Sequence, residues 1–484
     1  MTALDAAAPA ARPDADPPAS RTARTTPAAP PARPAEPGDD GAAIAARLAE
    51  LVRIPTVSAY AAETGPEPFE RFAERLRELY PLVHERLEHE RFGGTGLLYR
   101  WPAEAGPDRE RSEREGALLL MAHYDVVPAE PEGWTHPPFS GTIAVGAVHG
   151  RGTLDDKGAL VAVLEAVERL LAEGASPARD SYLFFTGTEE TDGADAAAGA
   201  ELLRGRGFRP WLVLDEGGAV VDAPLPFLEV EAAMIGVAEK GSATIRLEAE
   251  GAPGHASAPA GPTAAERIAR AVRRLRFARF PARMQPAVRR MLRVFLPHTR
   301  GTGALALRAL TAAPGLGARL LARRGGDAAS MVRTTLATTV LRAGTAVNVL
   351  PANASAVLNL RIAPGETVAG ALRRVRRAVR DREVRVRLLD GSEPTGVAPV
   401  DDGRFAALRR AGEASYPGVV TAPYIVLAAT DARRFQRYWA PCYRFAPLRM
   451  TLAQRASVHG VDEHVTIDSL ERGAAFHRAL LTMR

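Results

Sequence analysis

Short acidic and histidine clusters recur along this chain, and their side chains are of the kinds that bind metal ions. The clusters are His123-Tyr124-Asp125, Asp155-Asp156-Lys157, Glu189-Glu190 and Asp215-Glu216, and His464 follows near the C-terminus. A lone histidine or acidic pair in a loop is most often a solvated turn, so each cluster alone says little. Two histidines and at least three carboxylates, if brought together, are the ligands expected for a pair of zinc ions.

The segments that precede these clusters have the pattern of buried strands. ALLLMA (117–122), SYLFF (181–185) and WLVL (211–214) are short apolar runs, and each is followed closely by polar residues. Helices are predicted from Gly41 to before Pro55 and over 158–174, where apolar residues recur three and four apart and Gly174 marks the end. Apolar strands alternating with helices predict an α/β sheet covered on both faces.

The carboxyl ends of strands in such a sheet are where binding sites form. We therefore expect the side chains of the four clusters to converge in one crevice. Several carboxylates in one crevice would repel one another unless cations lay between them. The arrangement of strands and clusters thus favours a metal site.

A second kind of pattern begins near Lys240. The segments 242–251, 354–362 and 384–389 alternate apolar and polar residues, as half-buried strands do, and helices are predicted from Ala264 and over 366–382. Two such strand–helix units predict a smaller α+β two-layer domain inserted into the larger one.

The predicted domain boundaries follow from these patterns. A catalytic domain is expected over 40–238 and 391–484, with an inserted domain over 239–390 that includes an extra basic segment at about 280–330. Residues 1–39 are rich in Ala and Pro and contain no aromatic residue, so we expect a disordered tail.

Composition excludes several classes of protein. The chain has 484 residues, of which 46% are hydrophobic and 25% charged, so it is not collagen-like, disulfide-rich or disordered as a whole. Cys442 is the only cysteine, no apolar run reaches the ~18–20 residues that span a bilayer, and no signal-peptide pattern begins the chain. A cytoplasmic location without stable membrane insertion is expected.

The net charge is +5, and nearly all of the positive charge comes from arginine, because Lys157 and Lys240 are the only lysines. Both lie in motif stretches, DDKG and EKG. This placement suggests positions where the bulkier guanidinium group of arginine cannot replace the ammonium group of lysine. Eleven arginines fall between Arg267 and Arg300, interleaved with Phe, Met and Leu. This basic segment is interpreted either as a solvated face over an apolar packing face, or as a surface for an anionic membrane or a gate for lipophilic acyl chains. Nucleic-acid binding is not expected, since no recognition module is visible.

The motifs described above resemble those of the di-zinc aminoacylase/carboxypeptidase superfamily, over about residues 40–484. The branch that includes carboxypeptidase S and the N-fatty-acyl-amino-acid synthase/hydrolases is the most similar. The stretches AEKGSATIRLEAEGAPGHASAP (238–259), MVRTTLATTVLRAGTAVNVLPANASAVLNLRIAPG (331–365) and YRFAPL (443–448) carry that similarity. The resemblance implies a zinc-peptidase-like α/β catalytic domain, with a central mixed sheet flanked by helices, and an inserted two-layer lid that can also form a homodimer.

The resemblance also implies roles for individual residues. Two Zn²⁺ ions per chain are expected, with Co or Mn as possible substitutes. One ion would be bound by His123, Asp155 and Asp215, and the second by the bridging Asp155 together with Glu190 and His464. Asp125 would hold the ring of His123, and Asp155 and Asp156 would flank a strained peptide bond. Glu189 would be the general base, taking a proton and passing it to the leaving amine.

The implied substrate is a small molecule with a free carboxylate. Asn348 and Arg361 fall on positions that bind that carboxylate, and His255 would stabilise the tetrahedral oxyanion, in many relatives from the partner subunit. The expected activity is cleavage of an amide bond to an amino acid, by a carboxypeptidase acting on short peptides or by an N-acyl- or N-fatty-acyl-amino-acid hydrolase that can also run in reverse. A metal-free binding or scaffold protein is the alternative from another class. Ala428-Ala429-Thr430-Asp431 departs from the Gly-rich pattern of relatives, which is expected to reshape the substrate pocket.

Overall fold

The computed structural model describes residues 39–484, except for 223–224, 226–227, 229 and 279. The predicted N-terminal tail therefore lies, apart from Asp39, outside the described residues. None of the helices in the described ranges is long and apolar enough to cross a membrane.

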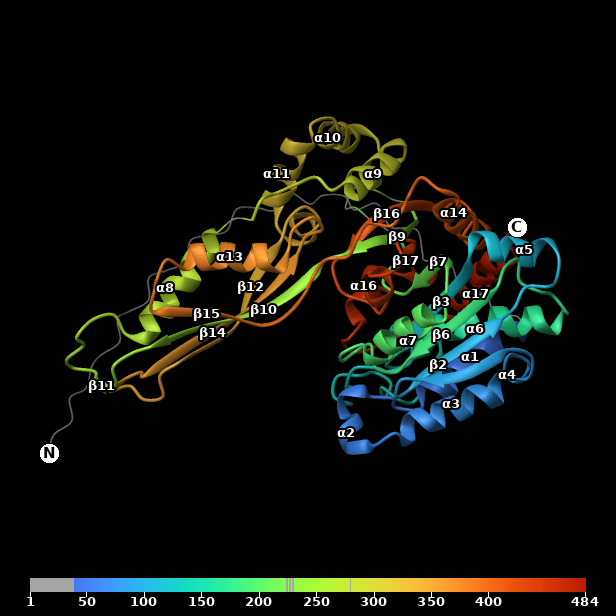
Figure 1. Ribbon diagram of the computed structural model, residues 1–484, viewed down its shortest axis with the longest axis horizontal. Helices are drawn as coiled ribbons and strands as arrows, with labels where there is room; N and C mark the ends of the chain where they lie inside the picture. The colour runs from blue at the N-terminus through green and yellow to red at the C-terminus, as the bar shows by residue number, and fades with distance from the viewer. Residues whose placement is uncertain (1–38, 223–224, 226–227, 229, 279) are drawn as a thin grey trace, which may run out of the picture. The chain divides into compact units, whose positions relative to one another are not determined.

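The larger sheet of the described part of the chain has ten strands and is mixed (Figure 1). Its central strands β6, β3, β7 and β17 are parallel neighbours. The pairs β1–β2, β2–β6, β17–β9 and β8–β9 are antiparallel, whereas β16 is parallel to β9 and β18 is parallel to β8. In spatial order the strands are β1 (Glu88–Phe92), β2 (Gly96–Trp101), β6 (Ser181–Thr186), β3 (Ala117–His123), β7 (Pro210–Asp215), β17 (Cys442–Arg444), β9 (Ala232–Glu239), β8 (Val220–Val221) and β18 (Arg449–Met450), with β16 (Val420–Val426) beside β9.

Both faces of this sheet are covered, which explains why its central strands are continuous apolar runs. In β3, Leu118 and Leu120 join one hydrophobic core, and Leu119 and Met121 join another. Two groups of helices surround the larger sheet. The helices that belong to the first core are α1 (Asp39–Val52), α3 (Glu67–Leu79), α4 (Pro81–Arg86), α6 (Lys157–Ala172), α14 (Gly403–Ser415) and α17 (Ile467–Thr482). The helices that belong to the second core are α7 (Ala194–Gly205) and α15 (Ala432–Gln436).

The predicted strands and helices of this region are confirmed to within two or three residues. The strands predicted at 117–122, 181–185 and 211–214 are β3, β6 and β7, and the helix predicted at 158–174 is α6. Gly174 has a φ of 70°, which a residue with a Cβ rarely adopts, and this conformation ends the helix. Short elements complete the region: η1 (Ser58–Tyr60), α2 (Ala61–Thr64), α5 (Pro107–Glu115), α16 (Leu452–Ser457) and a small sheet of β19 (His464–Thr466), β5 (Ala147–His149) and β4 (Thr142–Ala144).

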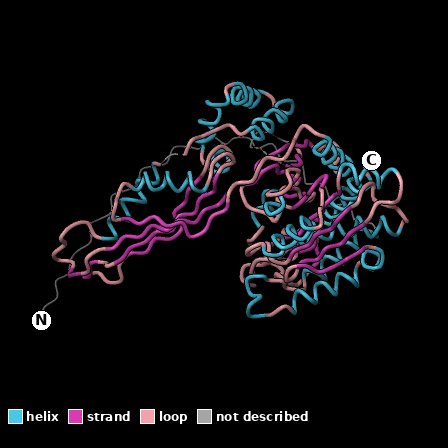
Figure 2. Tube along the Cα trace, viewed as in Figure 1, coloured by secondary structure: helices cyan, strands magenta, loops and turns pink. Residues whose placement is uncertain are grey.

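A second, antiparallel sheet forms from the alternating segments. Its order is β12 (Thr335–Ala343), β14 (Asn353–Ile362), β10 (Gly241–Glu250) and β15 (Val384–Ser392). Helices α8 (Ala264–Phe277) and α13 (Val368–Val379) lie on one face of it and enclose a separate hydrophobic core (Figure 2). The alternation predicted β10, β14 and β15, but not the edge strand β12. The two-stranded ladder of β11 (Gly254–His255) and β13 (Val349–Leu350) adjoins this sheet in sequence.

The basic segment folds as helices. These are α9 (Pro286–Phe295), η2 (Leu296–His298), α10 (Gly301–Ala312), α11 (Pro314–Arg324) and α12 (Gly326–Ser330). Helix α9 packs on β16, and its Val288, Met291, Leu292 and Phe295 are buried in the core of the larger sheet. The apolar packing face expected for this segment is therefore present in α9.

Candidate metal centre

Three neighbouring parallel strands deliver the predicted clusters to one edge of the larger sheet. Strand β3 ends at His123, which is opposite Thr186, the last residue of β6. Glu189 and Glu190 follow β6, and Glu216 follows Asp215 at the end of β7. Asp155 comes from the loop just before α6. The carboxyl ends of these strands thus place polar side chains together, as the sequence predicts.

Asp155 lies at the centre of this group of side chains. Its Oδ1 is 2.9 Å from Nε2 of His123, and its Oδ2 is 3.1 Å from Nε2 of His459. His459 Nε2 is also 3.0 Å from Oε1 of Glu190. The two oxygens of Asp155 therefore face two different histidines.

Two sets of side chains converge closely enough to bind a metal ion. Within the described residues, the ligand atoms of His123, Glu189 and Glu190 lie within 4.8 Å of one another, as do those of Asp155, Glu190 and His459. These sets combine imidazole nitrogens with carboxylate oxygens, the donors that zinc takes in proteins. The donor chemistry of the site therefore fits divalent metal ions.

The structure does not place His464 in this group. In β19 it is the cross-strand partner of His149, the two rings stack with their centres 5.1 Å apart, and its Nδ1 is 2.8 Å from the carbonyl oxygen of Asp462. His459, five residues earlier, lies beside Asp155 and Glu190 instead. The cause is a turn in which His459 and Asp462 both have positive φ values of about 60°.

Asp215 is not among the side chains of these two converging sets. Its Oδ2 accepts a hydrogen bond of 2.6 Å from the backbone nitrogen of Ala432. The neighbouring Glu216 instead lines the same cavity as Asp155. Burial raises the pKa of Glu216 well above its usual range, and the nearby Asp155 and Glu189 raise it further. Glu216 and Asp155 therefore line one cavity, whereas Asp215 is hydrogen-bonded to the backbone at Ala432.

Asp125 connects two of the predicted clusters. Its carboxylate accepts hydrogen bonds from the backbone nitrogens of Glu189 (3.1 Å) and Glu190 (3.0 Å). Its Oδ1 also lies 3.4 Å from Nδ1 of His123. Asp125 thus orients the imidazole and fixes the turn that carries both glutamates. The peptide bond between Asp155 and Asp156 is cis.

Glu189 has the surroundings of a carboxylate that accepts protons. Burial raises its pKa well above the usual range, the charge of His123 opposes this effect, and Asp431 and Asp155 add to it. It belongs with His123 to one of the two converging sets. A carboxylate with a raised pKa is suited to general acid–base chemistry near neutral pH.

Glu463 holds the loop that carries Asp155, and no pattern in the sequence indicates this role. The fully buried Oε1 accepts hydrogen bonds from the backbone nitrogens of Gly152 (3.1 Å), Leu154 (2.8 Å) and Asp155 (3.2 Å). Its Oε2 pairs with the buried Arg151, which also donates to the carbonyl oxygen of Gly460 at 2.8 Å. This Glu463–Arg151 pair therefore ties the Asp155 loop to the turn that begins at His459.

Both lysines are buried and donate to backbone carbonyls. Lys157 Nζ donates to Leu51 (3.1 Å) and Ile54 (2.7 Å), and burial lowers its pKa to about 7. Lys240 Nζ donates to Ser330 and Arg333, each at 3.0 Å. Lys157 thus connects the beginning of α6 to the end of α1 and the residues just after it. Lys240 connects the junction of β9 and β10 to the end of α12 and the segment before β12.

The residues predicted to bind substrate lie on the smaller sheet and its extension. His255 is exposed, with its Nδ1 2.7 Å from Oγ of Ser257, and the backbone of Asn348 accepts a hydrogen bond from Ala256. His255 and Asn348 are therefore close. Arg361 is opposite Ser242, near the beginning of β10, whereas β10 ends toward the ladder of His255. The sheet thus separates Arg361 from the other two residues.

An apolar cavity of about 460 Å³ opens at the metal centre, a size typical of small-molecule sites. Its polar groups come from Asp155, Glu216, Asp327, Tyr424 and Arg455, and Ala428 of the divergent loop is part of its wall. Most of the lining is aliphatic, including Leu154, Val221, Leu225, Met234, Met291, Met331, Ile425, Leu427 and Met450. Met291 comes from α9, and Met331 directly follows α12.

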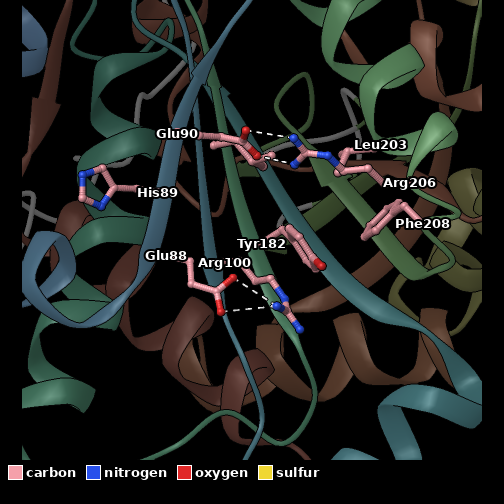
Figure 3. A pocket seen from close by; sticks show the side chains of 9 residues that line it. Glu88, His89, Glu90, Arg100, Tyr182, Leu203, Arg206 and Phe208 are labelled. Atoms are coloured by element: carbon pink, nitrogen blue, oxygen red, sulfur yellow. Dashed lines mark hydrogen bonds and ion pairs between the residues drawn. The ribbon is translucent and has the colours of Figure 1, made fainter.

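Another pocket, of about 300 Å³, has a different character (Figure 3). Its walls contain Glu90 paired with Arg206 and Glu88 paired with Arg100, so its charges already have partners within the protein. It contains none of the predicted site residues. The apolar cavity beside Asp155 is therefore the candidate substrate site.

Comparison with known proteins agrees with this geometry. The family model for peptidase family M20/M25/M40 matches residues 119–483. The chain belongs to this family. It is 33% identical to the N-fatty-acyl-amino acid synthase/hydrolase PM20D1.1 of Danio rerio over 440 residues, which cover 89% of this chain and 83% of that protein. It is 31% identical to the probable carboxypeptidase S-like 2 of Dictyostelium discoideum, over 85% of this chain and 79% of that one.

Solved structures of the family share the fold. An M20 family metallo-carboxypeptidase from Sulfolobus solfataricus matches with a TM-score of 0.65 and 18% identity, over 90% of this chain and 98% of that chain. Human carnosine dipeptidase 1 matches with a TM-score of 0.60 and 17% identity, over 91% and 96%. The predicted α/β fold and the predicted class of enzyme, a metal-dependent hydrolase of the M20 amidohydrolase and carboxypeptidase type, are confirmed. Divalent-metal use follows from the family and from the converging side chains.

Proposed function

We propose that this enzyme hydrolyses N-acyl amino acids with lipophilic acyl groups, using two zinc ions. The observation that carries the proposal is the largely apolar cavity that Asp155 and Glu216 line together with many aliphatic side chains. A hydrocarbon chain buried there gains roughly 0.8 kcal/mol per methylene. The scissile amide would then lie against the metal-binding side chains.

The proposed ligands follow the geometry. Asp155, His123 and Glu216 would hold one ion, and Asp155, Glu190 and His459 would hold the other. Bound zinc would polarise the scissile carbonyl and acidify a water molecule. Asp125 keeps the ring of His123 oriented through its Nδ1 side, 3.4 Å away.

Glu189 is the proposed general base. It lies within the same set of side chains as His123 and Glu190, so it can reach the attacking water and then the amine that leaves. Since an enzyme does not shift an equilibrium, the same groups also catalyse condensation of a free acid with an amino acid when both are abundant. The Danio rerio relative is named for both directions.

The amino-acid end of the substrate is assigned to the smaller sheet. A guanidinium grips a carboxylate through two parallel hydrogen bonds, which suits Arg361, and we keep Asn348 and His255 as the proposed carboxylate and oxyanion contacts. Because Arg361 lies at the other end of the sheet from His255, the proposal includes a homodimer in which the partner supplies His255 and Asn348. The proposed location is the cytoplasm, where the buried Cys442 stays reduced.

A substrate series tests the acyl preference. N-acetyl, N-lauroyl and dipeptide forms of the same amino acids are compared at equal metal content. The N-lauroyl compounds are expected to have kcat/KM values at least about tenfold above the N-acetyl compounds. Short-peptide carboxypeptidase activity is the second candidate, supported by the similarity to carboxypeptidase S-like proteins, and dipeptides hydrolysed faster than any N-acyl compound would establish it instead.

A cavity variant locates the acyl chain. Met291→Gln places an amide in the cavity wall and should lower kcat/KM for N-lauroyl substrates at least about tenfold, with a much smaller effect on N-acetyl substrates. Met284→Gln is the matched control, because Met284 belongs to the same insertion but does not line the cavity. Equal losses in both variants, or for both substrates, would contradict the proposed acyl site.

Metal analysis tests the ions separately. We expect about two zinc ions per chain by mass spectrometry of the purified protein and loss of metal in Asp155→Ala. A fully active protein with no bound metal would overturn the mechanism whatever the substrate.

A further inference from the structure

The positive charge of the chain is concentrated in one segment. Residues 267–326 contain fifteen arginines and no acidic residue, so this segment carries +15, whereas the whole chain carries only +5. The remainder of the protein is therefore acidic, with a formal charge of −10. A segment with such a bias attracts polyanions and anionic surfaces.

Leucines are exposed among these arginines on α10 and α11. Leu305 is 64% exposed, Leu316 57% and Leu320 46%. In contrast, the large apolar residues of α9 are buried in the core of the larger sheet. These exposed leucines add little to the stability of the fold, because much of each side chain remains in contact with water.

Exposed arginines accompany these leucines. Arg308 lies on α10, and Arg319, Arg323 and Arg324 lie on α11, all four of them exposed. A shallow groove of about 450 Å³ combines the two residue types, with Leu310, Leu320 and Leu321 beside Arg323 and Arg324. Aliphatic side chains next to guanidinium groups match both parts of an anionic phospholipid, the acyl region and the headgroup.

The two helices are also connected in sequence to the apolar cavity of the metal centre. Met291 lines the cavity just before α10, and Asp327 and Met331 line it just after α11. The α10–α11 hairpin is thus an excursion between two pieces of the cavity wall. A surface that binds this hairpin would be linked to the wall of the substrate site.

We propose that the α10–α11 hairpin (301–324) docks the enzyme on the surface of an anionic phospholipid bilayer. The exposed leucines enter the boundary between headgroups and acyl chains, and the arginines bind the phosphates. The hairpin lies on the surface and does not span the bilayer. Nucleic acid is the less suitable polyanion, because its phosphate backbone offers no partner for three exposed leucines. The docking does not depend on which substrate the metal centre hydrolyses.

Vesicle sedimentation with the full-length, metal-loaded enzyme tests this docking. Vesicles of equal parts phosphatidylglycerol and phosphatidylcholine should bind the protein at least about tenfold more tightly than vesicles of phosphatidylcholine alone, and added salt should weaken the binding. The variant R308Q/R319Q/R323Q/R324Q should lose at least about tenfold in affinity. L305S/L316S/L320S should lose binding even at low salt, since it removes the apolar contact and retains the charge.

A matched control distinguishes the effect of this surface on vesicle binding from the effect of net charge. R373Q/R374Q/R376Q/R377Q removes the same charge from α13, whose four arginines are exposed but which has no large exposed hydrophobic residue among the described ones. This control should bind the anionic vesicles within about threefold of the unaltered protein. All variants should hydrolyse a water-soluble N-acetyl substrate at the unaltered rate, which shows that they are folded.

Three results would overturn the docking. They are equal affinity for both kinds of vesicle, an equal loss in the α13 control, and tighter binding to a DNA duplex than to anionic vesicles with the same dependence on Arg308, Arg319, Arg323 and Arg324. If vesicle binding is as expected but N-lauroyl substrates are not hydrolysed, only the proposed acyl specificity fails.

Discussion

The metal centre and the α10–α11 hairpin use charged side chains in opposite ways. At the centre, carboxylates and histidines are held by buried partners, as in the hydrogen bonds of Glu463 to the Asp155 loop. On the hairpin, Arg308 and Arg319 are exposed, in a segment that contains no acidic residue. Burial with many partners fixes geometry, which catalysis needs, whereas exposure leaves charge free for a surface or for solvent. Substitutions should therefore have large effects at the centre and small ones on the hairpin.

The largest effect is expected for the proposed base. Glu189→Gln keeps the size of the side chain but removes its ability to accept a proton, so kcat should fall at least about a thousandfold while metal content stays the same. Stopped-flow kinetics and metal analysis on the same preparation measure both. Turnover at the unaltered rate would show that another group is the base.

Two histidines that are close in sequence should differ sharply. His459→Ala removes a side chain 3.1 Å from Asp155 and 3.0 Å from Glu190, so we expect loss of about one metal ion per chain and at least a hundredfold loss of activity. His464→Ala, its control, should retain both ions and activity within about threefold. The reverse result would restore His464 as the ligand and contradict the placement seen here.

A smaller loss is expected for the residue that positions the Asp155 loop. Glu463→Gln weakens its pairing with Arg151 and its bonds to three backbone nitrogens, so metal affinity or kcat should fall roughly 10- to 100-fold. Titration with zinc of the metal-free variant distinguishes positioning from general destabilisation, which thermal unfolding reports. A variant that is less stable but has unaltered metal affinity would reduce Glu463 to a structural role.

The two buried lysines test the centre through packing. Lys157→Arg adds bulk where the side chain is fully buried, so stability should fall by about 1–3 kcal/mol, and activity should fall because Asp155 is only two residues away. Lys240→Arg, at the junction with the smaller sheet, should cost similar stability with less effect on metal content. Denaturant unfolding measures the loss of stability. Unaltered stability in both variants would mean that the presence of lysine instead of arginine at these two positions has no structural cause.

The smallest effect is expected on the hairpin. Leu305→Ser changes a side chain that is 64% exposed, so stability should change by no more than about 0.5 kcal/mol. Thermal unfolding in the absence of lipid measures this. A loss above about 2 kcal/mol would show that α10 packs against another part of the chain in solution, and the contrast between the two regions would fail.

The sequence alone determined three strands of the larger sheet, the polar clusters that follow them and the metal-dependent hydrolase class of the enzyme. β3, β6 and β7 were predictable because buried parallel strands are continuous apolar runs. His123, Asp155 and Glu190 were predictable because they lie within a few residues of strand or helix ends. The smaller sheet was predictable from period-two alternation in β10 and β14. The exposed edge strand β12 shows no such alternation, and it was missed.

Only the tertiary structure decided between adjacent candidates. Asp215 and Glu216 are neighbours in the sequence, yet Asp215 bonds the backbone of Ala432 and Glu216 lines the cavity. His459 and His464 both follow α16, and the left-handed turn between them directs His459 to Asp155 while strand pairing directs His464 to His149. Pattern and composition identify residue types suited to metal binding, but the direction of a side chain depends on backbone turns and long-range partners. Those contacts join residues more than three hundred positions apart, as Glu463 and Arg151 do, and no local pattern records them.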